Sequence, residues 1–184
     1  MRRVSRQGDC MMDPILDEYA FNLVYARRLV ADVPDEWMAR SAGPGHENHP
    51  AFALGHLVIA SAIAAEILGL DRDVPPGWAE LFERQGPGDR RFPSEVAEAY
   101  PPKHELLAAL MRQHERVTAG IRNADPTTLE TPFKWRLNEW MPTTGGVLTF
   151  LCTAHEALHL GQLAAWRRAM GLPAALANEP SGTG

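Results

Sequence analysis

Cysteine is scarce in this sequence, and so are the features that would mark a secreted or membrane protein. The two cysteines among 184 residues, Cys10 and Cys152, do not make the disulfide framework of a small secreted domain. No stretch approaches the roughly 18 consecutive apolar residues that a membrane span requires. The opening residues, "MRRVSRQGDCMM", are charged but lack the apolar core of a secretory signal. We therefore expect a cytoplasmic protein with no membrane partner.

Basic charge is also in short supply. Asp and Glu outnumber Lys and Arg by 23 to 18, and the formal net charge is −5. Because a nucleic-acid-binding surface needs a basic patch to neutralise phosphates, we expect no nucleic-acid partner. The hydrophobic share of 45% and the charged share of 22% are typical of a folded globular domain.

Strand patterns are missing as well, whereas helical patterns are plentiful. No turn dipeptide lies between two alternating apolar runs, as a β-hairpin would need. Four long segments instead repeat apolar residues three or four positions apart. They are residues 13–33, 48–70, 102–124 and 144–171. Asp13 is the expected cap of the first helix, with Pro14 as its first helical residue, and Asn48 is the expected cap of the second.

These segments predict an all-α protein, specifically a four-helix bundle. Helices of about 20 residues are about 30 Å long, which suits a bundle. The connections at 71–93 and 125–143 are long enough to cross its end and to wall a pocket. We expect the bundle domain to span residues 13–173, with an N-terminal tail at 1–12 and a C-terminal tail at 174–184.

Two of the seven histidines stand one turn apart in the last predicted helix. Steps of four and three residues along this helix trace one core-facing seam. The seam consists of Leu148, Cys152, His155, His159, Gln162 and Trp166. His56 lies on the apolar stripe of the second helix. If these two helices are neighbours, three neutral imidazoles could hold one divalent metal ion; otherwise the histidines are hydrogen-bonded core residues.

The sequence "HEALH" at 155–159 also matches H-E-x-x-H, the pattern of zinc peptidases, in which the glutamate is the general base. These enzymes also need a third zinc ligand, and no residue of this sequence fits the known positions well. One class of these enzymes needs a glycine three residues after the second histidine, where this chain has Gln162. Glu179 lies in a Gly- and Pro-rich terminal stretch with no helical pattern. A metal hydrolase or peptidase with Glu156 as its base is therefore the lesser alternative, and we expect Glu156 on the helix surface or in an ion pair.

Two stretches carry a family resemblance. "GHLVIA" in the second helix and "HEALHLGQLAAWRRAMGLP" at the end of the fourth resemble the DinB-like (DinB/YfiT) superfamily, over roughly residues 13–173. The resemblance implies a four-helix bundle with an up-down-down-up course. It also implies a metal held by His56, His155 and His159, and an incidental Glu156, since the residue after the first histidine of the pair varies in this family.

The same resemblance implies a function. The best understood members are metal-dependent S-transferases and isomerases that use low-molecular-weight thiols, and homodimers are common among relatives. We expect a small-molecule substrate, with zinc or nickel as the first candidates for the metal and iron or copper as the others. The alternative of a different class is a non-catalytic stress or binding protein with a structural metal.

Three more residues near the motif are candidates for supporting roles. Gln162 is expected to hold an imidazole or a water by its amide, or else to satisfy nearby backbone groups. Arg167 and Arg168 are candidates for binding a carboxylate of the thiol. Their alternative role is to favour the dipole at the C-terminal end of the helix.

Overall fold

The computed structural model describes residues 12–84, 86, 89 and 91–176, and in this part of the chain every regular element is helical. Four long helices form the bundle, the last of them composite. They are α1 (Asp13–Val30), α2 (Pro50–Ile67), α4 (Lys103–Asn123) and the continuous run of α6 (Thr144–Phe150), η3 (Leu151–His155) and α7 (Glu156–Ala169). The connections hold short helices: η1 (Asp35–Trp37), α3 (Trp78–Phe82), η2 (Ala97–Ala99) and α5 (Pro126–Glu130). The all-α prediction is confirmed.

Some of the sequence predictions concern residues that are not described. The expected tails fall on 1–11 and 177–184, apart from Met12 and residues 174–176. Cys10 and Glu179 also lie outside the described residues.

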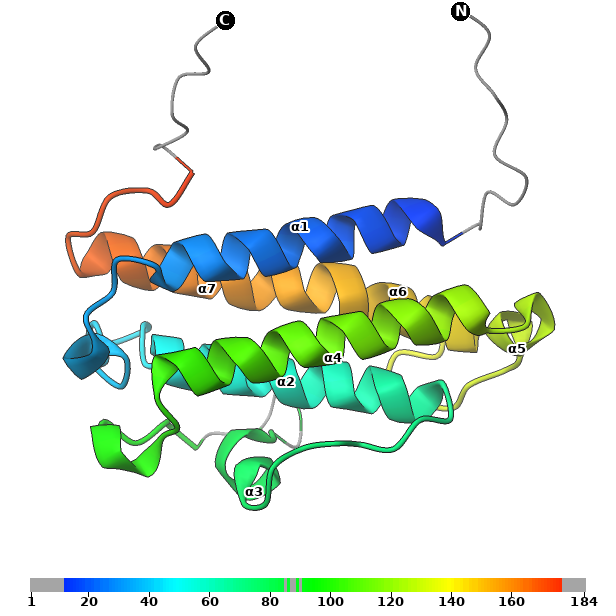
Figure 1. Ribbon diagram of the computed structural model, residues 1–184, viewed down its shortest axis with the longest axis horizontal. Helices are drawn as coiled ribbons and strands as arrows, with labels where there is room; N and C mark the ends of the chain where they lie inside the picture. Colours follow the sequence, from blue (N-terminus) through cyan, green and yellow to red (C-terminus); the bar gives the residue numbers. More distant parts are fainter. Residues whose placement is uncertain (1–11, 85, 87–88, 90, 177–184) are drawn as a thin grey trace, which may run out of the picture.

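The bundle places the second and last long helices side by side. α2 packs against α4 and α7, and α1 packs against the same two helices from the other side. In Figure 1, α2 and α4 run in one direction, opposite to α1 and to the α6–α7 run. A residue on α2 can therefore share a site with residues on α7.

Helix α2 is the central helix of the molecule. Between Pro50 and Ala65 its side chains are buried with few exceptions, because α3 covers it in addition to α4 and α7. It comes nearer to a membrane span than the sequence prediction allowed, since its mean hydropathy is 1.6 over 18 residues. However, 78% of these residues are buried inside the molecule. That burial is what a core helix of a bundle shows.

Both predicted N-terminal caps are wrong. α1 begins at Asp13 itself, so the cap position falls to Met12; the Asp13 carboxylate lies in the first turn, where it favours the helix dipole. α2 is capped by His49, whose Nδ1 accepts a hydrogen bond from the backbone N–H of Phe52 at 3.3 Å. Asn48 instead donates a hydrogen bond from Nδ2 to Oε1 of Gln162 on the last helix.

The middle of the predicted seam of the last helix is wrong by one residue. The helix is continuous, as expected, but η3 is a π-helical turn, which holds one residue more than an α-helical turn. Leu148, Cys152 and Trp166 of the predicted seam are buried as expected. Within α7 before Trp166, however, the buried residues are Glu156, Leu160 and Leu163, one position after the predicted His155, His159 and Gln162. The histidines of the seam are consequently half-buried at the edge of the core.

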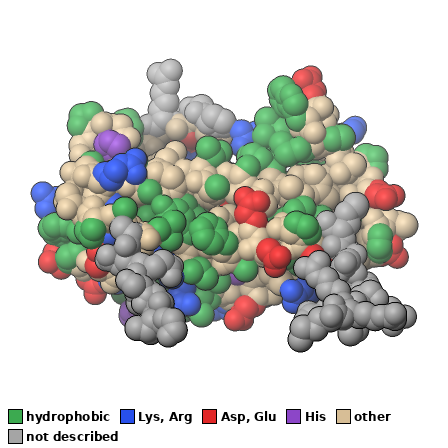
Figure 2. All heavy atoms as spheres, turned by 90° about the horizontal axis from the view of Figure 1, so that it is seen from above, with side chains coloured by type: hydrophobic (Ala, Val, Ile, Leu, Met, Phe, Trp, Pro, Cys, Tyr) green, Lys and Arg blue, Asp and Glu red, His purple; other side chains and the backbone are tan. Residues whose placement is uncertain are grey.

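Acidic, basic and hydrophobic side chains are interspersed on the face that α1 contributes to (Figure 2). On the part of this face that the structure describes, Lys and Arg side chains form no continuous patch. Two apolar residues of α1 are exposed, Phe21 at 52% and Val24 at 46%.

Candidate metal centre

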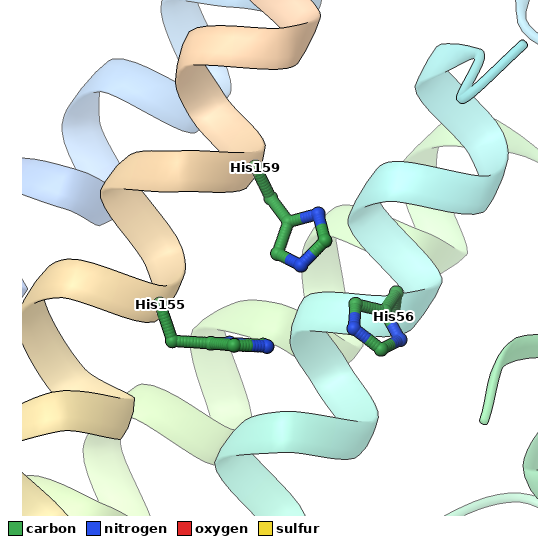
Figure 3. A group of neighbouring side chains, drawn as sticks. All are labelled: His56, His155 and His159. Atoms are coloured by element: carbon green, nitrogen blue, oxygen red, sulfur yellow. The ribbon is translucent and has the colours of Figure 1, made fainter. Parts of the chain in front are cut away.

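Three histidines from two neighbouring helices meet between α2 and α7 (Figure 3). His155 and His159 stand one turn apart and point toward His56 on α2. The ring centroids of His159 lie 4.6 Å from His56 and 4.7 Å from His155, and those of His56 and His155 are 5.4 Å apart. One nitrogen from each ring lies within 4.8 Å of the other two. Among the described residues, this is the one cluster of potential ligands close enough to hold a metal ion.

In His56 and His159 the Nδ1 atom makes a hydrogen bond, which leaves Nε2 available to bind a metal. His56 Nδ1 lies 2.9 Å from the carbonyl oxygen of Phe82. A carbonyl can only accept, so Nδ1 carries the hydrogen and Nε2 keeps its lone pair. His159 Nδ1 lies 3.1 Å from Oε1 of Gln162, which also accepts from Nδ2 of Asn48 at 3.0 Å. Both rings thus present Nε2 as the unprotonated nitrogen.

His155 has no such support. Its Nδ1 is buried and has no hydrogen-bond partner among the described residues. A buried polar atom without a partner costs about 1–3 kcal/mol, and such atoms in native proteins call for an explanation. His155 thus differs from the other two histidines, because no described group holds its Nδ1.

Burial keeps the three imidazoles neutral. Burial, with a smaller contribution from the neighbouring histidines, lowers the pKa of His155 to about 4 and that of His159 to about 3. Arg136 adds to the effect on His155. Burial also lowers the pKa of His56, against the opposing effect of its bond to Phe82. Neutral imidazole is the form that binds a metal, so these residues fit a divalent ion.

An apolar cavity of about 510 Å³ opens beside His56 and His155. Side chains of α2 form one wall and those of α6 and η3 form the other, and the connection before α6 covers the end. The principal lining residues are Ile59, Ile63, Ile67, Val147, Phe150 and Trp135.

A second cavity, of about 520 Å³, opens beside His159 and Gln162 of α7. It is more polar, because Arg84, Arg91 and Arg136 line it together with Asp89 and Asn48. The two cavities share His56, Arg84, Gly86, Arg136, Phe150 and His155. The two cavities therefore meet at the histidine cluster, and two arginines lie at their junction.

Glu156 lies away from both cavities. Its side chain is buried, and Oε1 lies 2.9 Å from Nε2 of His114 on α4. The His114 ring stacks on Tyr19, with centroids 3.6 Å apart. Burial raises the pKa of Glu156, against the opposing effect of His114. We expected Glu156 on the helix surface or in an ion pair, and the structure shows it paired with a basic residue in the core. In this position the carboxylate does not face a substrate.

Neither of the candidate arginines at the end of α7 lines these cavities. Arg167 is buried and binds both carboxylate oxygens of Asp32, at 2.5 and 3.0 Å. It also donates to the carbonyl oxygens of Leu29 and Pro173. Arg168 is exposed. The structure thus gives Arg167 a role in joining α7 to the end of α1.

Sequence reasoning missed four contributors to the site. Asn48 was assigned to a helix cap, and Phe82 contributes a backbone carbonyl, which no side-chain pattern reveals. Arg84 and Arg136 lie in long connections whose course periodicity does not determine. The available signal was the length of these connections, and the prediction that they wall a pocket is confirmed.

The fold and the histidine cluster together define an all-helical bundle protein with a candidate metal site. A family model for the DinB superfamily matches residues 20–163. The chain belongs to this superfamily, which confirms the resemblance seen in its two motifs. All three histidines and Gln162 lie within the matched region, whereas Arg167 and Arg168 lie beyond it. No curated protein matches the chain.

Proposed function

We propose that this protein is a metal-dependent S-transferase that joins a low-molecular-weight thiol to a small electrophile. The observation that carries the proposal is the meeting of three neutral imidazoles at the junction of a positively charged cavity and an apolar one. His56, His155 and His159 would hold the ion, with zinc or nickel as first candidates and iron or copper as the others. A divalent ion bound there lowers the pKa of a thiol, so that it is a thiolate near neutral pH.

The positively charged cavity supplies the binding site for the thiol. Low-molecular-weight thiols commonly carry carboxylates, and the planar fork of an arginine binds a carboxylate through two hydrogen bonds. Arg84 stands at the junction, with its guanidinium 4.1 Å from the centre of the Phe52 ring. Arg136 stands beside it on the same two cavities. These two arginines take the role that the sequence suggested for Arg167 and Arg168.

The reaction balances without any further reagent. The thiolate sulfur forms a bond to the electrophilic carbon, and the leaving group departs with the pair of electrons of the broken bond. The thiol proton passes to solvent through the polar cavity. Asn48 and Gln162 hold the His159 ring throughout, so that the nitrogen facing the cluster stays unprotonated.

The first test is the metal content of the purified, tag-free protein, measured by plasma mass spectrometry. We expect about one equivalent of a divalent metal in the wild type and its loss in His159→Ala. His104→Ala is the matched control, because His104 is exposed on α4 and should leave the metal in place. Full metal content in His159→Ala would refute the site.

The second test separates catalysis from a structural role for the metal, which is the main alternative. A chelated protein that keeps its helical circular dichroism and loses thiol-transfer activity supports the proposal. Cooperative unfolding on chelation would favour a structural metal instead.

The third test addresses the peptidase alternative. Glu156→Gln keeps the volume of the side chain, and we expect it to retain metal and thiol-transfer activity. Peptide hydrolysis by the wild type that Glu156→Gln abolishes, with metal still bound, would support the peptidase.

A further inference from the structure

Apart from Arg84 and Arg136, which line both cavities, the lining of the apolar cavity is not used by the proposed binding of the thiol. The chemistry of this remaining lining indicates which ligand it binds. We infer that it binds the electrophilic substrate, and that this substrate is a neutral, apolar molecule with its reactive carbon at the end formed by His56 and His155. This inference rests on the proposed function, because it assigns the second substrate of the same reaction.

The part of the cavity between α2 and α6 is lined by apolar side chains. Ile59, Ile63 and Ile67 of α2 face Val147 and Phe150 across it. The indole of Trp135 also lines it, but Nε1 already donates to the carbonyl oxygen of Met141 at 2.7 Å. The ring therefore presents an apolar surface to the cavity. A ligand in contact with these walls would leave any polar group of its own without a partner, at the cost of desolvation.

Two acidic residues of the lining share one basic partner. Glu66 and Glu83 line the cavity, and Arg72 lies between them, 3.6 Å from one carboxylate and 2.9 Å from the other. The other two charged residues of the lining, Arg84 and Arg136, also line the polar cavity and therefore lie at the junction of the two. Away from this junction the described lining offers no unpaired cation to an anionic ligand, which favours a neutral substrate there.

The size and shape of the cavity limit the substrate further. A volume of about 510 Å³ lies within the range of small-molecule sites. At its end near the histidines, the rings of Trp135 and Phe150 lie 5.4 Å apart between centroids, and Phe150 in turn lies 5.8 Å from His155. Aromatic surfaces next to the reacting atoms favour aromatic or branched alkyl compounds that carry a leaving group.

The cavity is tested with para-fluorotoluene, a neutral probe that cannot react, followed by fluorine NMR on the metal-loaded protein without thiol. We expect saturable binding and nuclear Overhauser contacts from the probe to the methyl groups of Ile63 and Val147. Ile63→Trp fills the cavity and should weaken binding about tenfold or more. Leu107→Trp is the matched control: Leu107 is a half-buried leucine in a separate hollow formed by α1 and α4, and binding should be unchanged.

Three results would overturn the inference. They are no saturable binding, equal binding by the wild type and Ile63→Trp, or equally tight binding of para-fluorobenzoate with contacts to the same methyl groups. If Ile63→Trp fails to fold, the contacts seen in the wild type decide between the cavity and another location. Because the probe carries no leaving group, the result is independent of catalysis. Bound probe without any transferase activity would refute the proposed function alone, and activity without bound probe would refute this cavity.

Discussion

At the scale of single residues, the site depends on which ring nitrogen of each histidine carries the hydrogen. The carbonyl of Phe82 and the amide oxygen of Gln162 determine this for His56 and His159. Such partners fix the orientation of a ligand and raise its basicity. The support of His159 is a side chain, so it can be removed by substitution.

Removing that support should weaken the metal without removing a ligand. In Gln162→Ala the His159 ring can rotate and change tautomer, and we expect metal affinity to fall about 10- to 100-fold. Gln162→Glu should restore most of it, because a carboxylate also accepts from Nδ1–H. Competition with a chelator of known affinity measures both variants. Wild-type affinity in Gln162→Ala would show that the bond to His159 is immaterial.

The lowered pKa values of two histidines predict a pH dependence for the metal-free protein. Both values, about 4 for His155 and about 3 for His159, lie below the 6.5 expected in the unfolded chain. Between these limits the unfolded state binds more protons, so the free energy of unfolding rises with pH and falls on acidification. Each histidine contributes up to about 1.4 kcal/mol per pH unit.

Urea unfolding of the metal-free protein at several pH values between about 4 and 7 measures this slope. His159→Gln removes one of the two groups, and the slope should decrease accordingly, while other titrating groups contribute equally to both proteins. An unchanged slope in His159→Gln would contradict the burial of a neutral His159.

At the scale of elements, close packing of α3 on α2 determines where His56 points. Gly55 precedes His56, and a Cβ at this position would overlap the ring of Phe82. The glycine therefore lets the chain at Phe82 come close enough for its carbonyl to bind Nδ1 of His56. The short G-H pair in the sequence has a packing reason that lies in another element.

Gly55→Ala should push α3 away and disturb His56. We expect a loss of about 1–3 kcal/mol in stability and weaker metal binding. Gly161→Ala on α7 is the matched control, because a Cβ there meets nothing within 4 Å and should stabilise the helix by up to about 1 kcal/mol. Thermal unfolding and metal content measure both variants, and a Gly55→Ala protein with wild-type metal content would refute this account.

At the scale of the whole molecule, one buried arginine joins the ends of α1 and α7. The contact between Arg167 and Asp32 spans 135 positions of the sequence. It also satisfies the carbonyl oxygens of Leu29 and Pro173 near the ends of these helices. This junction lies away from the histidines, so its loss should affect the fold rather than the site.

Substitutions of two neighbouring arginines test whether this junction supports the fold and not the metal site. Arg167→Ala should destabilise the protein by about 2–3 kcal/mol, because it removes charged hydrogen bonds from buried carbonyls while Asp32 regains water. Arg168→Ala should change stability by less than about 0.5 kcal/mol, since that side chain is exposed. Chemical denaturation measures both. Metal content and the KM for the thiol should remain as in the wild type, and a raised KM in Arg168→Ala would instead restore its role in binding the thiol.

The sequence by itself determined the helical class, the approximate bounds of the four long helices and the identity of the three histidines. These features depend on local periodicity and on residue type, and both can be read directly from the amino-acid sequence. It did not determine the π-helical turn. One extra residue in a single turn changes the spacing of the apolar residues too little to be distinguished from the spacing of a regular α-helix. The buried residue at this turn is Glu156 and not His155. The sequence pattern therefore did not predict that the Glu156 side chain lies in the core.

Only the tertiary structure decided which groups surround the histidines. Asn48, the Phe82 carbonyl, Arg84 and Arg136 come from connections, and their positions follow from how these segments close over the bundle rather than from any local preference. Arg167 and Arg168 are adjacent in the sequence and alike in chemistry, yet one is buried against Asp32 and the other is exposed. Side chains one residue apart on a helix differ by about 100° in direction, and only the packing of neighbouring helices determines which of them is covered.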